Sequence, residues 1–236
     1  MRVLAVIPAF NEQGKVGAVV RKVPPGLVDR ILVVDDASTD LTSDEARAAG
    51  ADVVRHASNL GVGAAIRTGI DRALAEGFDA VVVLSGDDQH EPSELPRVLE
   101  PLRTGRCDFV QGSRWLPGGA SPNITRFRSV LTRAYAWSFR RVIDFPCTDG
   151  TNGFRAFSTM LFRGERRIDL WQEWLNTYEL EPYLLYSAIR AGYRVLEVPV
   201  TVRYPIGRGG FTKMKPVRDW WRILRPLVYL RLGVRQ

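Results

Sequence analysis

The sequence predicts an α/β fold with a mostly parallel central sheet flanked by helices. Over the first 115 residues, short apolar runs rich in Val and Ile alternate with longer amphipathic stretches, which is typical of a parallel sheet covered by helices. Each expected helix follows a polar or Gly-rich turn. The chain has 236 residues and is 45% hydrophobic, which is enough to bury a substantial core.

The expected strands are short runs dominated by apolar residues, and the stretches between them fit helices. The strands are placed at Val3 to Ile7, Arg30 to Asp35, Asp52 to Arg55, Ala80 to Leu84 and Phe109 to Gln111. The helices are placed at Gln13 to Lys22, Thr42 to Ala49, Gly63 to Glu76 and Ser93 to Leu102. Ligands of open α/β sheets bind beyond the carboxyl ends of the strands. The turns PAFNE, DDAST, NLGVG and SGDDQH are therefore expected to meet at one crevice.

From about residue 120 the sequence changes to long aromatic and basic stretches, including FRSVLTRAYAWSFRRVIDF and DWWRILRPLVYLRLG. No repeat, low-complexity segment or flexible linker separates this part from the first. We therefore expect one domain over residues 1–236 rather than two independent domains.

Positive charge is concentrated at the C-terminal end. The formal net charge is +7, but residues 203–236 hold nine Lys and Arg residues and a single acid, Asp219, so the rest of the chain is close to neutral. A basic surface favours anionic partners, namely phosphates, nucleic acid or an acidic membrane face. Composition alone does not choose among them.

The cellular compartment is predicted from cysteine usage and apolar runs. Cys107 and Cys147 lack metal-like spacing and are interpreted as reduced residues of a cytosolic protein. The N-terminal apolar run is too short for a signal peptide, and no uncharged apolar run approaches the ~20 residues that a membrane span requires. We therefore expect a cytoplasmic protein.

Acids follow the first two expected strands, in VIPAFNE at residues 6–12 and VVDDASTD at residues 33–40. Asp35, Ser38 and Asp40 are explained as turn and helix-capping residues. Asp36 has a second interpretation, because a carboxylate at a strand tip can accept the N–H of a pyrimidine or guanine base. Neither GxGxxG after the first strand nor GxxxxGK[ST] occurs, so dinucleotide and P-loop sites lose support.

The stretch SGDDQH is the candidate metal site. If these residues remain extended, Ser85, Asp87 and Gln89 share one face and Asp88 takes the other. Carboxylate and amide oxygens suit a hard cation such as Mg²⁺ or Mn²⁺, with phosphates and water completing the ligand set. The alternative is a solvated turn that caps the helix after Pro92.

Together, VIPAFNE, VVDDASTD, NLGVGAAIRTG, SGDDQHEP, GSR, DGTNGFRAF, EVPV and TKM resemble the family 2 inverting glycosyltransferases, specifically the dolichol- or polyprenyl-phosphate sugar synthases. The resemblance covers nearly the whole chain in the right order. It implies a GT-A fold, a nucleotide-sugar donor and Mg²⁺ or Mn²⁺. It also implies a nucleotide pocket lined by Pro8, Ala9, Asn11, Glu12 and Asp36, and a metal held by Asp87 and Gln89.

The resemblance assigns parts of the single domain to different tasks. Residues 1–118 would bind the nucleotide and metal, residues 119–202 would form the acceptor side, and residues 203–236 would be a basic, membrane-associating tail. The chain departs from the family pattern at Ser85, where the first Asp of Asp-x-Asp-x-Gln is expected. With one carboxylate fewer, metal binding should depend more on the donor diphosphate.

The resemblance also implies phosphate-binding and catalytic residues. The candidates for binding phosphates are Arg114, Arg128, Thr132, Arg208 and Lys213. An ionised lipid phosphate needs no strong general base, whereas a hydroxyl acceptor does. The candidate catalytic residues are Asp87, Arg114 and Asp149, the last as the carboxylate available for a base or a sugar contact. Glu179 and Glu181 are rivals, although the start of a helix before Pro182 explains both.

The last long stretch predicts an amphipathic helix kinked at Pro226. Its basic side would carry Arg218, Arg222 and Arg225, and its apolar stripe would carry Trp221, Leu224 and Val228. Such a helix suits the membrane interface, and a core helix with arginines reaching for water is the alternative.

We therefore expect an enzyme that is peripheral at the inner face of the membrane and transfers sugar to a polyprenyl phosphate, with a membrane protein as a further partner. One rival is a family 2 transferase with a soluble or polysaccharide hydroxyl acceptor. The other is a non-catalytic module that binds nucleotides or nucleic acid, although nucleic acid is the less favoured partner.

Overall fold

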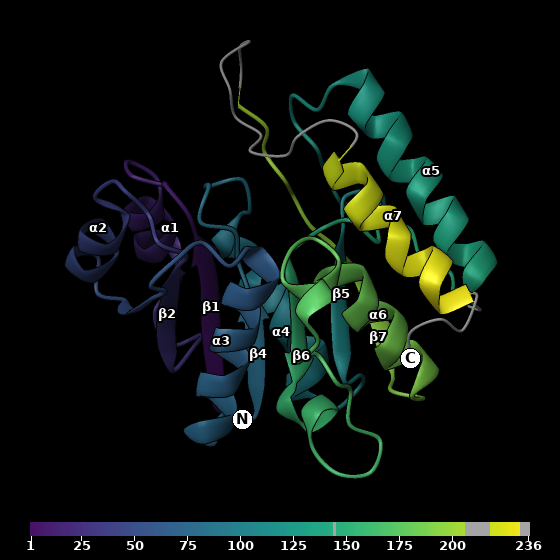
Figure 1. The fold of residues 1–236 in the computed structure, drawn as a ribbon, viewed down its shortest axis with the longest axis horizontal. Helices are drawn as coiled ribbons and strands as arrows, with labels where there is room; N and C mark the ends of the chain where they lie inside the picture. Colours follow the sequence, from purple (N-terminus) through teal and green to yellow (C-terminus); the bar gives the residue numbers. More distant parts are fainter. Residues whose placement is uncertain (144, 206–217, 232–236) are drawn as a thin grey trace.

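The structure is a computed structural model that describes residues 1–143, 145–205 and 218–231. Its centre is a seven-stranded sheet in the order β3-β2-β1-β4-β6-β5-β7, with helices on both faces (Figure 1). The strands are β1 (Val3–Ala9), β2 (Arg30–Asp35), β3 (Asp52–Arg55), β4 (Ala80–Val83), β5 (Phe109–Ser113), β6 (Arg155–Ser158) and β7 (Val195–Pro199). The helices are α1 (Val16–Lys22), α2 (Thr42–Ala48), α3 (Val62–Ala75), α4 (Leu95–Arg103), α5 (Arg126–Val142), α6 (Leu180–Arg190) and α7 (Arg218–Arg231).

The expected α/β fold is confirmed, and the five expected strands are all present. All strand pairs are parallel except those of β6, which is antiparallel to both β4 and β5. Neither β6 nor β7 was expected from the sequence. The four residues of β6 include two polar side chains, so they lack the apolar run that marked the other buried strands. The carboxyl ends of β1, β2 and β4 lie at one edge, as parallel pairing requires.

Several predicted boundaries need correction. Helix α1 begins at Val16 rather than Gln13, because Gly14 has a φ of 81° and the chain turns there before the helix starts. Strand β4 ends at Val83, one residue early, whereas β1 and β5 each extend two residues further than expected. Such shifts are ordinary at the ends of elements.

The alternation of side chains along the strands divides the core into two clusters. Val3, Ala5 and Ile7 of β1 face a cluster that includes α1 and α4. Leu4 and Val6 face the other cluster, which includes α3, α5, α6 and the inner face of α7. The sheet is therefore covered on both sides.

Helices α5 and α7 lie side by side, far from β1 to β3 (Figure 1). Helix α7 also contacts α6, and its Ile223 and Leu227 are buried in the larger core cluster. Within the described part of the chain, no helix combines the length and apolar character needed to cross a membrane.

Candidate active site

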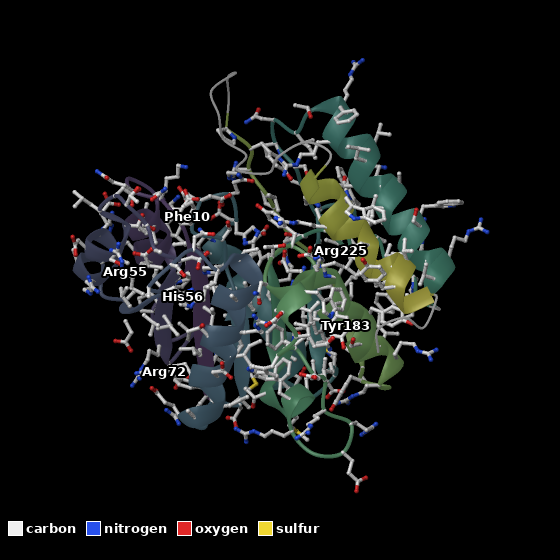
Figure 2. All side chains as sticks on the ribbon, viewed as in Figure 1. Phe10, Arg55, His56, Arg72, Tyr183 and Arg225 are labelled. Atoms are coloured by element: carbon white, nitrogen blue, oxygen red, sulfur yellow. The ribbon has the colours of Figure 1, made fainter. Side chains whose placement is uncertain are left out.

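A cavity of about 620 Å³ opens at the carboxyl edge of the sheet. One wall comes from the ends of β1, β2 and β4 and the start of α3, so the four turns predicted to converge contribute to a single cavity. The opposite wall comes from α5, α6, α7 and the loop at residues 150–153. Figure 2 labels His56 on the strand-end side and Arg225 on the helical side. We call these two sides the strand-end wall and the helical wall.

Asp36 lies in the strand-end wall, just after β2, and its carboxylate is held from several sides. Its Oδ1 accepts the backbone N–H of Leu60 at 2.8 Å and lies 2.8 Å from Nδ1 of His56. Its Oδ2 accepts the backbone N–H of Gly61 at 2.7 Å. Asp36 is buried yet lines the cavity, so it presents a fixed carboxylate there.

The neighbouring acids in the same turn have local tasks. Asp35 accepts hydrogen bonds from Ser38 and Ser43. Burial raises the pKa of Asp35, but these hydrogen bonds and the nearby Arg55 outweigh it and hold the pKa below its usual value. Asp40 accepts the backbone N–H of Thr42 at 3.0 Å. The turn interpretation of these two acids therefore agrees with the structure.

Four of the five residues predicted for the nucleotide pocket line the cavity, namely Pro8, Ala9, Glu12 and Asp36. Asn11 does not. It has a φ of 52°, and its side-chain oxygen accepts the backbone N–H of Thr39 at 2.8 Å, which ties the turn after β1 to the turn after β2. In this structure Asn11 supports the shape of the wall.

The SGDDQH stretch places Ser85, Asp87 and Gln89 at the cavity. Asp88 has a φ of 63°, and both its carboxylate oxygens accept hydrogen bonds from Lys22, at 2.6 and 2.7 Å. The premise of an extended segment was therefore wrong, because the strand ends at Val83 and a turn follows. The left-handed conformation of Asp88 turns the chain and separates the two adjacent carboxylates.

His90 stabilises this turn from within the protein interior. Its Nδ1 accepts the backbone N–H of Ser85 at 3.0 Å, and its ring stacks on Phe154 with centroids 5.0 Å apart. Burial, together with the nearby Arg114 and Arg155, lowers the pKa of His90 to about 3, so the imidazole is neutral. In this structure His90 is therefore a local hydrogen-bonding residue.

The oxygen donors of this turn fit a hard divalent cation only in part. Asp87 offers a carboxylate, one oxygen of which accepts the backbone N–H of Gln89 at 3.2 Å, and Gln89 offers an amide oxygen. Among the described residues, no group of three or more His, Cys, Asp or Glu side chains could hold a metal ion. A cation bound here would therefore take most of its ligands from a diphosphate and water.

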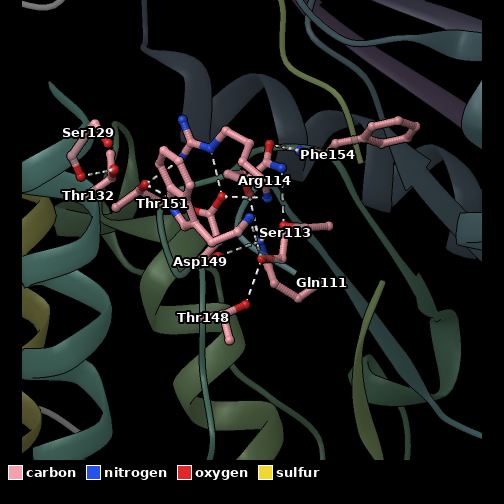
Figure 3. A network of polar contacts seen from close by, with 12 residues as sticks. Gln111, Ser113, Arg114, Ser129, Thr132, Thr148, Asp149, Thr151 and Phe154 are labelled. Carbon is pink, nitrogen blue, oxygen red and sulfur yellow. Dashed lines mark hydrogen bonds and ion pairs between the residues drawn. The ribbon is translucent and has the colours of Figure 1, made fainter. Parts of the chain in front are cut away.

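Arg114 and Asp149 form a buried ion pair (Figure 3). The guanidinium donates from Nε to Oδ2 at 2.6 Å and from Nη2 to Oδ1 at 2.7 Å, and its Nη1 donates to the hydroxyl of Tyr204. Although burial opposes it, Asp149 raises the pKa of Arg114. A proton-accepting role for Asp149 would require this pair to separate. Arg114 lines the cavity, whereas Asp149 is fully buried.

The remaining predicted phosphate ligands have different fates. Arg128 of α5 lines the cavity, and its guanidinium lies 4.9 Å from the centre of the Tyr204 ring. Thr132 is buried one turn later and donates to the carbonyl of Ser129 at 3.0 Å, as Figure 3 shows, so its hydroxyl is engaged within the helix. Arg208 and Lys213 lie outside the described residues.

Two features of the helical wall were missed. Arg222 and Ile223 of α7 line the cavity, so the last helix forms part of the pocket. Arg225 holds that helix in place, because its Nη2 lies 2.5 Å from Oε1 of the fully buried Glu179. The predicted basic side of α7 therefore faces inward in part. The sequence could have indicated this only if the pairing of Arg225 with the distant Glu179 had been known.

The sequence is similar to known proteins over most of its length. The family model for Glycosyl transferase family 2 matches residues 4–165. An undecaprenyl-phosphate mannosyltransferase of Micrococcus luteus is 33% identical over 207 residues, which cover 85% of this chain and 83% of that protein. A polyprenol monophosphomannose synthase of Mycolicibacterium smegmatis is 34% identical, with 85% of this chain and 77% of that protein covered.

Solved structures show the same fold. A glucosyl-3-phosphoglycerate synthase of Mycobacterium tuberculosis, in complex with phosphoglyceric acid, has a TM-score of 0.71 at 23% identity, covering 100% of this chain and 81% of that chain. The fold is therefore GT-A, as expected. The chain belongs to glycosyl transferase family 2, and it is a glycosyltransferase similar to the polyprenyl-phosphate sugar synthases.

Proposed function

We propose that the protein is a metal-dependent, inverting transferase that moves a sugar from a nucleotide-sugar donor to a polyprenyl phosphate at the membrane surface. The observation that carries this proposal is the pairing of two unlike walls around one cavity. The strand-end wall offers oxygen acceptors, which suit a nucleotide and a cation. The helical wall offers Arg128 and Arg222, which suit the phosphate of an acceptor.

The charges on the substrates define the chemistry. An oxygen of the lipid phosphate, already ionised near neutral pH, forms a bond to the anomeric carbon while the bond from that carbon to the diphosphate oxygen breaks. Attack from the face opposite the leaving group inverts the anomeric configuration. No proton has to be removed from the attacking oxygen, so a general base is unnecessary. The engagement of Asp149 with Arg114 is compatible with such a reaction.

The leaving group takes the bonding electrons and departs as a nucleoside diphosphate. Its negative charge needs compensation as it develops. Asp87 and Gln89 would hold Mg²⁺ or Mn²⁺, which supplies positive charge to the diphosphate when bound. Because Ser85 provides no carboxylate, we expect the cation to bind tightly only together with the donor.

The outer faces of α5 and α7 form the proposed membrane surface. The exposed apolar side chains on these adjacent helices are Phe127, Val130, Trp137, Trp221, Leu224 and Val228. Helix α5 also carries five arginines and no acid. Apolar side chains flanked by arginines suit the headgroup region of an anionic bilayer, and the inner faces of the same helices line the cavity. A lipid phosphate could thus reach the pocket while its chain stays in the bilayer.

The test compares acceptors that differ in one group. Purified protein is incubated with a panel of nucleotide sugars, Mn²⁺, and anionic vesicles that contain either a polyprenyl phosphate or the matching polyprenol. We expect glycolipid only with the phosphate, with the anomeric configuration inverted relative to the donor. Glycolipid formed equally well from polyprenol would favour a hydroxyl acceptor, and a lack of product from every donor would refute the proposal.

A further inference from the structure

The carboxylate of Asp36 has one acceptor position left for a ligand. An ionised carboxylate has about four lone-pair sites. Leu60 and His56 occupy the two sites of Oδ1, and Gly61 occupies one of the two on Oδ2. The remaining position therefore belongs to Oδ2, on a residue that lines the cavity.

The ring of His56 is held in place, so it continues to occupy the second acceptor position on Oδ1 of Asp36. A carboxylate only accepts hydrogen bonds, so Nδ1 of His56 carries the hydrogen that faces Asp36. On the other side of the ring, Nε2 lies 2.9 Å from the hydroxyl of Thr68, which in turn lies 3.1 Å from the carbonyl of Ala64 in α3. The side chain of His56 is only 9% exposed. A ligand is therefore not expected to displace it.

We infer that the donor carries an imide base, uracil or thymine, and that His56 sets this preference by filling the second acceptor position on Oδ1. The inference rests on the proposed function, because it takes a nucleotide to be the ligand of the strand-end wall. Uracil and thymine have a single ring N–H, at N3, which matches a single acceptor position.

The other bases match Asp36 less well. Guanine has N1–H and an amino group side by side, which suit a carboxylate with both oxygens open. With Oδ1 filled, one of these donors would lose its partner on leaving water, and such a loss is costly. Cytosine has a lone pair at N3, which would face the lone pairs of Asp36. His56 is thus a positioning and specificity-determining residue, since it acts through Asp36.

The test measures equilibrium binding of UDP, GDP and CDP to the whole protein by titration calorimetry, with Mn²⁺ and without acceptor. The three nucleotides share ribose and diphosphate, so differences report on the base. We expect the dissociation constant of UDP to be at least about tenfold lower than those of GDP and CDP. GDP or CDP binding as tightly as UDP would mean that the pocket supplies further matching groups, and would overturn the inference.

Variants of His56 test its part. In His56→Ala the second position on Oδ1 opens, so the ratio of GDP to UDP dissociation constants should fall about tenfold. His56→Asn places an amide N–H near the position of Nδ1 and should largely preserve that ratio. Ser58→Ala, an exposed position in the same loop, is the control. An unchanged ratio in His56→Ala, or an equal fall in His56→Asn, would refute the role of His56.

The outcomes separate this inference from the proposed function. If glycolipid forms from a GDP-sugar but not from a UDP-sugar, the transferase proposal stands and the base assignment fails. If none of the nucleotides binds, both fail. Binding of UDP without glycolipid formation supports the base assignment and argues against the lipid acceptor.

Discussion

The two walls of the cavity are built in different ways. The strand-end wall is part of the sheet edge, where backbone N–H groups and short turns fix polar side chains such as Asp36. The helical wall consists of helix faces, and α7 is held by the ion pair of Arg225 with Glu179. A fixed carboxylate suits recognition of the planar base of a nucleotide. Packed helices with apolar outer faces suit binding of a flexible lipid at a membrane. Variants in each wall should therefore impair different steps.

The largest effect is expected at the metal turn of the strand-end wall. Asp87→Ala removes the only carboxylate among the proposed ligands, so metal-dependent turnover should fall about a thousandfold. Asp88→Asn weakens a partly exposed ion pair with Lys22, keeps a residue type that tolerates the left-handed conformation, and should cost much less. The rate of nucleoside diphosphate release, measured against Mn²⁺ concentration, checks both. Equal losses would mean that the turn does not separate the roles of the two acids.

The same turn allows a gain of function. Ser85→Asp restores the carboxylate expected from the family pattern, at a position that lines the cavity. It should tighten Mn²⁺ binding in the absence of donor, which calorimetry can measure. Unchanged Mn²⁺ affinity would show that residue 85 does not face the cation.

The second largest effect is expected at the ion pair beneath the helical wall. Arg114→Ala leaves the buried Asp149 without its partner and should lower the free energy of unfolding by about 3–5 kcal/mol. Arg194→Ala, which breaks a similar two-point pair with Asp108 at the surface, is the matched control and should cost far less. Urea denaturation measures both. Similar losses of stability in the two variants would show that burial does not make the Arg114–Asp149 pair more important than the surface pair.

A smaller effect is expected where α7 docks. Glu179→Gln keeps the shape of the side chain but removes the charge that faces Arg225, so stability should fall by about 1–3 kcal/mol. Hydrogen exchange should show faster opening of α7, lipid-dependent turnover should fall, and UDP binding should stay unchanged. Glu173→Gln, at an exposed position, is the control. A loss of UDP binding would mean that the two walls are not separable.

The smallest effect is expected at the outer face of the helical wall. Trp137 and Trp221 are each 53% exposed, so replacing both with Ser should weaken binding to anionic vesicles about tenfold without changing stability or UDP binding. Trp171→Ser, another exposed tryptophan, is the control. Sedimentation with anionic and zwitterionic vesicles makes the measurement. Unchanged binding would move the membrane surface elsewhere.

The sequence predicted the strand-end wall better than the helical wall, for physical reasons. Buried parallel strands are recognisable in a sequence as apolar runs, and their carboxyl ends lie at one edge of the sheet. The positions of Asp36 and Asp87 could therefore be predicted from local patterns. The placement of Asp88 away from the cavity was predicted from an extended segment, whereas a left-handed turn produces it. The predicted position of Asp88 is therefore correct, although the extended conformation from which it was predicted is not.

The helical wall depends on contacts between distant residues, which a single sequence does not display. The engagement of Asp149 by Arg114 and of Glu179 by Arg225 could not be read from spacing. The amphipathic pattern did identify α7, and its apolar stripe of Trp221, Leu224 and Val228 is exposed. However, the pattern could not indicate that Arg222 would face the cavity, because that depends on where the helix packs.

The most direct test of transfer to a lipid phosphate is the stoichiometry of a single time course. Purified protein turns over a nucleotide sugar on vesicles that contain a polyprenyl phosphate, and nucleoside diphosphate and glycosyl polyprenyl phosphate are both quantified. We expect one glycolipid for each nucleoside diphosphate released, and negligible release without the lipid. Release that is independent of the lipid, with no glycolipid formed, would contradict the assignment of the helical wall to a lipid phosphate.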